Sequence, residues 1–259
     1  MKSHGVNEMT DNKKELKLDA VRADVRERVK AFAEKLKEEL GENLESITVV
    51  GSSLTEDFKA GSDINTVVVL GKQNLDSLRP IASLSRPMSR KRISPPVLMT
   101  KSYIERSRDV FGVELLDFQL NHETILGEDP FAALSFEKKD VRLQCERELK
   151  ATLIRLRQGY IAASANKKIV RDILISTAKG LGPLLRAMLW LKDIERPKTA
   201  EATFGKAADE FSVDTDSLRT AGKWRHEKAG LSETETASTF ESVYAAVDRL
   251  AEIVDELEV

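Results

Sequence analysis

Two short runs of β-branched residues, separated by a glycine-serine turn, limit most strongly what this chain can fold into. Ile47-Thr48-Val49-Val50 leads into Gly51-Ser52-Ser53, and a second run covers residues 64–70 and closes at Gly71. Runs of Val, Ile and Thr bounded by glycine are typical of strands. A continuous apolar run like the second is usually covered on both faces. The sequence therefore predicts two strands of a sheet that is flanked by helices.

The turn and the start of the second run carry groups suited to a polyphosphate. Glycine lets the backbone approach a ligand, and Ser52 adds a hydroxyl to N–H groups that point at an anion if a short helix begins at Ser53. Asp63 and Asn65 are two residues apart on a strand, so both project to one side. Two oxygen donors placed together suit Mg²⁺ that bridges to phosphate oxygens. The expected nucleotide-binding residues are Gly51, Ser52, Ser53 and Ser62.

This arrangement resembles a known signature. A strand, Gly51-Ser52, roughly ten residues, and then Ser62-Asp63 opening a second strand is similar to the motif of the nucleotidyltransferase superfamily related to DNA polymerase beta. The chain resembles its minimal members, and the helical second half is similar to the bundle of the kanamycin-nucleotidyltransferase-like branch. The resemblance implies transfer of a nucleoside monophosphate from an NTP, with ATP the first choice. The acceptor would be a hydroxyl or phosphate of an unidentified small molecule or protein. It also implies two Mg²⁺ ions held by three carboxylates.

The chain departs from this pattern at the second carboxylate position, where it has Asn65. An amide oxygen can bind Mg²⁺ but contributes no charge. The third carboxylate would come from a later strand, expected around Val113 to Phe118. Glu114 and Asp117 differ in parity, and Glu114 is favoured because it lies between apolar residues. The candidate catalytic and metal-binding residues are therefore Asp63, Asn65 and Glu114. Asn65 keeps a second interpretation open, a catalytically impaired nucleotide-binding or protein-interaction module.

The pattern changes after Asp129-Pro130, where Pro and Gly become scarce and long helical periods begin. The sequence therefore predicts an α+β protein, with a mixed-sheet nucleotidyltransferase domain over residues 1–132 and an antiparallel helical bundle over residues 133–259. In the first part we expect a helix over 18–40, a broken helix over 74–89 and a third strand over 97–99. In the second we expect a helix from Leu149, a central helix over 169–191 interrupted near Gly180–Pro183, and helices over 201–211, 214–227 and 240–257.

The last of these helices has a narrow apolar seam from Phe240 to Leu257. Such a seam suits antiparallel packing or a partner helix, so a homodimer through the helices is possible.

Charge and composition exclude several classes of function and of binding partner. The formal charge of −2 provides no global field for a polyanion or an anionic membrane. Residues 86–108 are locally basic, which could line a channel for triphosphate or for a nucleic-acid acceptor, although a solvated helix face is the commoner explanation. No aromatic interleaving supports stacking of a single strand. One cysteine, Cys145, excludes an intramolecular disulfide, and no apolar run approaches a membrane span. We expect a cytoplasmic protein without a membrane or nucleic-acid partner. A weaker third hypothesis is a ribonuclease that uses Arg219 and His226.

Overall fold

The computed structural model describes residues 15–164, 166–225 and 232–259. The described chain divides into two units. Unit 1 comprises the residues up to Arg108 together with Phe118–Ser135, and unit 2 comprises Asp109–Asp117 together with Phe136–Val259. The sequence places one boundary at residue 132, close to Ser135. It does not predict that the short stretch 109–117 is grouped with the helices.

Unit 1 is built on a four-stranded mixed sheet with the order β3-β2-β1-β4. Strand β1 (Leu44–Val50) pairs antiparallel with β2 (Asn65–Leu70) and with β4 (His122–Leu126), whereas β3 (Val97–Met99) runs parallel to β2. The last five residues of β1 and of β2 are all buried. The first three strands confirm the sequence prediction, and the sheet makes the protein α+β.

The prediction of a strand over Val113–Phe118 is wrong. These residues lie in helix α6 (Gly112–Leu120), and the fourth strand is β4. Leu, Glu and Gln dominate the segment and are strong helix formers, while Val113 is its only β-branched residue. Val113 and Leu116 are buried three positions apart, which is helical spacing rather than strand alternation.

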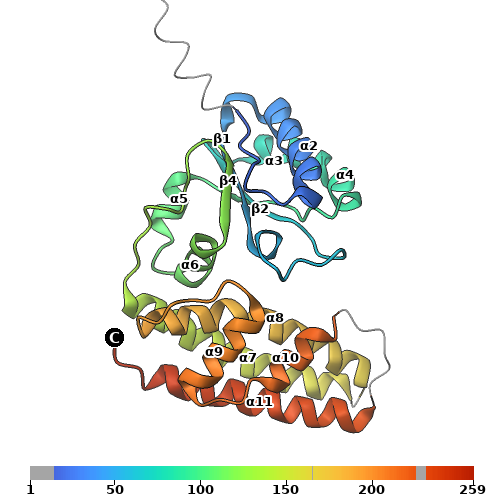
Figure 1. Ribbon diagram of the computed structural model, residues 1–259, viewed down its shortest axis with the longest axis vertical. Helices are drawn as coiled ribbons and strands as arrows, with labels where there is room; N and C mark the ends of the chain where they lie inside the picture. The colour runs from blue at the N-terminus through green and yellow to red at the C-terminus, as the bar shows by residue number, and fades with distance from the viewer. Residues whose placement is uncertain (1–14, 165, 226–231) are drawn as a thin grey trace, which may run out of the picture. The chain divides into compact units, whose positions relative to one another are not determined.

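Three helices cover one face of the sheet in unit 1: α2 (Ala23–Leu40), α3 (Leu75–Ser83) and α4 (Ser85–Arg90) (Figure 1). Their apolar residues form one core with the sheet residues that point toward them, including Ile47, Val49, Val68 and Leu70. A 3-10 turn (Gly41–Asn43) joins α2 to β1, a second 3-10 turn, η3 (Gly51–Leu54), follows β1, and α5 (Lys101–Arg106) follows β3.

Unit 2 is a bundle of long helices, α7 (Lys138–Ala163), α8 (Lys167–Leu191) and α11 (Glu233–Asp255), with the shorter α9 (Ala200–Phe211) and α10 (Asp216–Lys223) beside α8 (Figure 1). The seam of α11 is buried at Val243, Val247, Leu250 and Val254. Because α11 packs on α7 and α8, this seam is used within the chain and does not by itself indicate a dimer.

Helix α8 is continuous, so the expected interruption near Gly180–Pro183 is wrong. Proline removes one backbone hydrogen bond and costs about 3 kcal/mol inside a helix. Leu181, Leu184 and Leu185 are all buried around it, and each buried leucine contributes about 1.5–3 kcal/mol. Their packing therefore outweighs the local cost. None of the helices in the described ranges is long and apolar enough to cross a membrane.

Candidate functional site

The end of β1 and the start of β2 bring the predicted turn against Asn65. Val50 pairs with Asn65, and Gly51 follows with a φ of +78°, a conformation that side chains rarely tolerate. A Cβ at Gly51 would lie 3.9 Å from Asn65 Nδ2. The turn and the first residue of β2 are therefore neighbours, and the open space above Gly51 depends on glycine.

The turn itself is a single 3-10 turn rather than the start of a longer helix. The Gly51 N–H donates to the Asn121 carbonyl at 2.9 Å, so this N–H is occupied within the fold. Ser53 is buried and its hydroxyl is 3.5 Å from the Val50 carbonyl oxygen. Ser52 is half-buried, and its carbonyl accepts from the Thr55 N–H. Ser52 is thus the hydroxyl of the turn that a ligand could reach.

The loop before β2 holds Ser62 and exposes Asp63. Ser62 is buried, and its hydroxyl accepts from the Lys59 N–H at 3.1 Å while its own N–H donates to the Lys59 carbonyl. Ser62 therefore closes the loop. Asp63 is exposed and lines a depression of about 450 Å³ together with Arg86 and Arg92.

The predicted third carboxylate is not on a neighbouring strand. Residues 93–97, which run parallel to the start of β2, contain no Asp or Glu. Glu114 lies on α6 in unit 2, where Gln144 Nε2 donates to its Oε2 at 2.6 Å. Asp117 accepts from Arg186 Nε at 2.6 Å in the same unit. The argument that only one of Glu114 and Asp117 can face the metals required a strand, so it fails on a helix.

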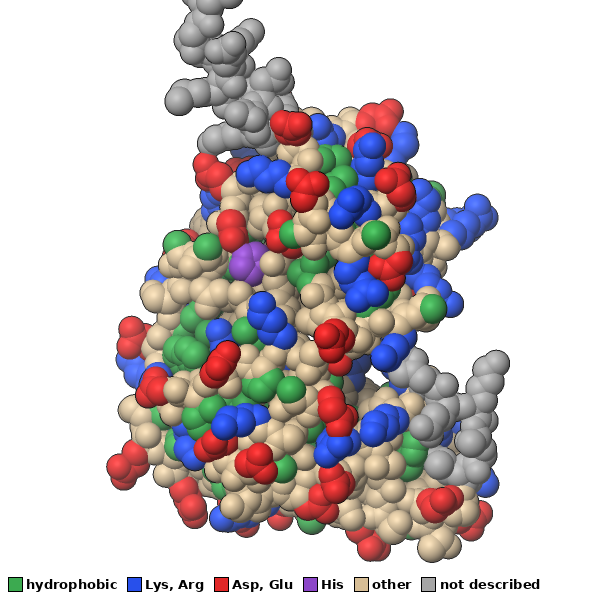
Figure 2. Space-filling model, viewed as in Figure 1, with side chains coloured by type: hydrophobic (Ala, Val, Ile, Leu, Met, Phe, Trp, Pro, Cys, Tyr) green, Lys and Arg blue, Asp and Glu red, His purple; other side chains and the backbone are tan. Residues whose placement is uncertain are grey.

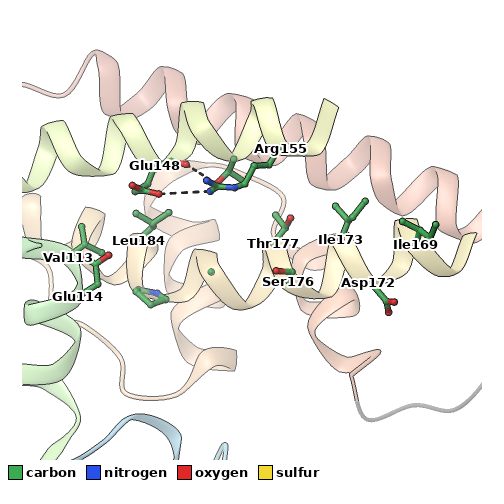
Figure 3. Close-up of a pocket in the computed structure, with 13 residues that line it drawn as sticks. Val113, Glu114, Glu148, Arg155, Ile169, Asp172, Ile173, Ser176, Thr177 and Leu184 are labelled. Carbon is green, nitrogen blue, oxygen red and sulfur yellow. Dashed lines mark hydrogen bonds and ion pairs between the residues drawn. The ribbon is translucent and has the colours of Figure 1, made fainter. Parts of the chain in front are cut away.

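Glu114 instead lines a pocket of about 740 Å³ within unit 2. Figure 3 shows Glu148 and Arg155 projecting from α7, with Thr177 and Ile173 on the facing α8. Arg155 Nη2 lies 3.9 Å from Glu148 Oε2 and donates to the Thr152 hydroxyl at 2.7 Å. The charged residues of the lining are Glu114, Glu148, Asp172 and Arg155, so carboxylates outnumber cations.

The carboxylates of this pocket also affect the pKa of a buried neighbour, Cys145. Burial, together with the smaller effect of the negative charges of Glu114 and Glu148, raises the pKa of the Cys145 thiol to about 12. A thiol held neutral in this way is a packed core group. The pocket therefore suits a neutral or cationic ligand.

Comparison with known proteins bears on the fold. No protein-family model and no curated protein matches the sequence. Among solved structures, the chain is similar to the spectinomycin adenyltransferase AAD(9) from Enterococcus faecialis, whose crystal structure was determined with ATP and spectinomycin. The TM-score is 0.56 at 11% identity, covering 86% of this chain and 98% of that chain. The chain has a nucleotidyltransferase fold.

The metal set that the sequence resemblance implies is only partly present. Among the described residues, no group of three or more His, Cys, Asp or Glu side chains could hold a metal ion. Asp63 offers one carboxylate and Asn65 one amide oxygen. Mg²⁺ is commonly held by one or two carboxylates together with substrate phosphates and water. These donors therefore fit one Mg²⁺ brought by a nucleotide, and they do not fit the two-metal site with three carboxylates.

A histidine-carboxylate pair, which the sequence did not reveal, lies at the same end of the sheet. His122 pairs with Val50, which in turn pairs with Asn65. Its Nε2 lies 2.8 Å from Asp129 Oδ2 and its Nδ1 lies 3.1 Å from the Gln119 carbonyl oxygen. Both ring nitrogens therefore face acceptors, so His122 fixes the loop after β4 and has no nitrogen left to act as a base.

The pKa of Asp129 reflects this pair. Burial acts to raise the pKa, but hydrogen bonds from His122 and from the Phe131 N–H outweigh it and leave the pKa below its ordinary value. The sequence contained only a weak signal for this pair, because His122 and Asp129 are seven residues apart and meet through the loop.

The ribonuclease hypothesis has little support in the nucleotidyltransferase fold. Arg219 forms ion pairs with Glu201 and Asp216. His226 lies outside the described residues. Trp224, between these two positions, is buried in the core of unit 2.

Proposed function

We propose that this protein transfers a nucleoside monophosphate from an NTP, with ATP the first choice, to a small-molecule acceptor. The acceptor oxygen would attack the α-phosphorus, the bond to the β-phosphate oxygen would break, and pyrophosphate would leave. The single observation that supports this most is the nucleotidyltransferase fold combined with Asp63 and the Gly51–Ser52 turn at adjacent strand ends. The similar structure, of an adenyltransferase, was solved with ATP and spectinomycin, which supports this proposal.

The proposed roles follow from position. Ser52 would donate its hydroxyl to a phosphate oxygen, and Gly51 would let that phosphate come close to the backbone. Asp63 and Asn65 would hold one Mg²⁺, which when bound would supply charge neutralisation at the phosphates. Catalysis would otherwise consist of positioning, and no covalent intermediate on the protein is needed.

The helical unit would contribute to recognition of the acceptor, and its cavity is acidic. Its carboxylates, Glu114, Glu148 and Asp172, favour an acceptor that carries a positive charge, while Ile169, Ile173 and Leu184 provide apolar contact. A buried and unpaired Cys145 is compatible with the reducing cytoplasm, which we propose as the site of action.

The test is pyrophosphate release from each NTP in the presence of Mg²⁺ and a panel of amine-bearing small molecules. Asp63→Ala should lower the rate of pyrophosphate release by about a hundredfold or more, because the Mg²⁺ that neutralises the phosphate charge would lose its carboxylate ligand. Glu56→Gln, an exposed carboxyl in the same loop, should leave the rate unchanged. Equal rates in wild type and Asp63→Ala would remove this assignment.

A second candidate function, nucleotide binding without turnover, is favoured specifically by Asn65 and by the absence of a carboxylate in residues 93–97. In that case MgATP would raise the melting temperature of the wild type without any pyrophosphate release. A ligand at a hundredfold excess over its Kd stabilises a protein by about 2.7 kcal/mol, so the shift is measurable. Activity gained in Asn65→Asp would then identify a decayed enzyme.

A further inference from the structure

The depression beside Asp63 is lined by cations and hydroxyls. Its walls come from α4, which contributes Ser85, Arg86 and Ser89, and from the chain that leads into β3, which contributes Arg92 and Ser94. Asp63 is its only acidic residue, so the lining carries one positive charge in excess. This is the opposite of the pocket in unit 2.

The two arginines retain most of their hydrogen-bonding capacity. Arg92 Nη1 donates to the Gly61 carbonyl at 3.0 Å, which uses one of five guanidinium donors and holds the side chain beside the loop of Asp63. Within the described part of the chain, the Arg86 guanidinium has no ion pair or hydrogen bond, and the Asp63 carboxylate has none either. The pocket thus presents donors that the fold leaves unused.

The surrounding surface adds positive charge. Arg90 and Lys91 follow Arg86 on and after α4, and Arg28 from α2 donates through Nη1 to the Lys91 carbonyl at 3.1 Å. On the face drawn in Figure 2, Lys and Arg side chains gather on the side of unit 1 where Figure 1 places α4. Two arginines of the basic segment 86–108, Arg86 and Arg92, therefore lie beside Asp63.

A nucleotide polyphosphate needs positive charge, and the ligands for the metal ions that would normally supply this charge are incomplete here. Asp63 is a single carboxylate, Asn65 is neutral, and residues 93–97 have no acid. Instead, Arg86 and Arg92 stand next to the remaining carboxylate. Arginine binds phosphate oxygens through two parallel N–H donors, which gives both charge and geometry.

We propose that Arg86 and Arg92 bind the polyphosphate tail of the nucleotide directly, so that binding does not require Mg²⁺. This inference rests on the proposed function for the identity of the ligand as a nucleotide. The hydroxyls of Ser85, Ser89 and Ser94 donate to the same phosphates, and Gly61 orients Arg92. Asp63, being anionic, opposes a bare polyphosphate in the same depression.

The experiment is calorimetric titration of the full chain with inorganic tripolyphosphate, ATP and AMP, in EDTA and then in Mg²⁺. In EDTA, tripolyphosphate and ATP should bind the wild type and AMP should bind far more weakly. Arg86→Gln should weaken tripolyphosphate binding about tenfold, the loss expected for one charge-assisted hydrogen-bonded contact. Arg90→Gln is the matched control, because it lies on the same helix outside the pocket lining, and it should stay within about twofold of the wild type.

Asp63→Asn distinguishes the two modes of binding, because they predict opposite changes in the affinity for tripolyphosphate. If the arginines hold the phosphates, removing the neighbouring negative charge tightens tripolyphosphate binding in EDTA. If phosphates bind only through a metal at Asp63, the wild type binds nothing in EDTA, and the same variant weakens tripolyphosphate binding in Mg²⁺. The second pattern overturns the proposal.

The remaining outcomes separate this inference from the proposed function. MgATP binding that is unchanged in Arg86→Gln overturns the arginine site while the nucleotidyltransferase assignment stands. Tripolyphosphate binding that depends on Arg86, without any ATP turnover, supports the site and contradicts the catalytic assignment. Tighter binding of a single-stranded oligonucleotide, reduced equally by Arg86→Gln and Arg90→Gln, overturns the proposal in favour of a nucleic-acid surface.

Discussion

Asp129 shows how a single carboxylate can make the stability of unit 1 depend on pH. Its pKa is lowered in the folded chain, so its stabilising effect is present above the unfolded value of about 3.9 and is lost as the pH falls through the folded pKa. We expect the wild type to melt higher than Asp129→Asn at pH 5.5, and this difference to shrink steadily toward pH 2. Melting curves over that range, with Glu56→Gln as the control, test the expectation. A difference that stays constant with pH would show that the carboxylate charge is not involved.

At the scale of elements, the contact between α7 and α8 depends on a residue without a side chain. A Cβ at Gly159 would lie 2.7 Å from Ile173 Cδ1, whereas a Cβ at Gly205 in α9 would meet no atom within 4 Å. Gly205→Ala should stabilise the protein by about 1 kcal/mol through helix propensity. Gly159→Ala should gain less than Gly205→Ala, because the end of the Ile173 side chain must shift to make room. Urea unfolding of the two variants compares them, and an equal gain at both positions would contradict the packing argument.

Element by element, the sequence predicted the fold where patterns were local. Glycine next to β-branched runs identified β1 and β2, and apolar steps of three and four identified α2 and α11. It failed at Val113–Phe118, where a short apolar segment fits either a strand or a helix and tertiary packing decides. The neighbours Gly51 and Asn65 could be predicted because adjacent strands fix them. The place of Glu114 in unit 2 and the position of the arginines beside Asp63 could not, since both depend on contacts between distant segments.

At the scale of the whole molecule, the protein has two hydrophobic cores composed of different residues. Leu174 is fully buried in the core of unit 2, so Leu174→Ala should destabilise that unit by about 2–5 kcal/mol. We expect hydrogen exchange to accelerate in α7, α8 and α11 while the amides of β1 and β2 keep their protection. Equal acceleration in both units would show that they unfold as one cooperative body.

The chain enters the helical unit at Asp109, leaves it after Asp117 and returns at Phe136. This detour has a consequence for any attempt to cut the molecule in two. A fragment that begins after residue 132 lacks Val113 and Leu116 from its apolar interior. The same fragment lacks Asp117, which pairs with Arg186 at 2.6 Å. The Arg186 side chain is only 11% exposed, so its charge would be left nearly buried without this partner. The helical unit therefore needs residues 109–117 from the first half of the chain. A fragment without them would have a cavity in its core and a buried charge without a partner.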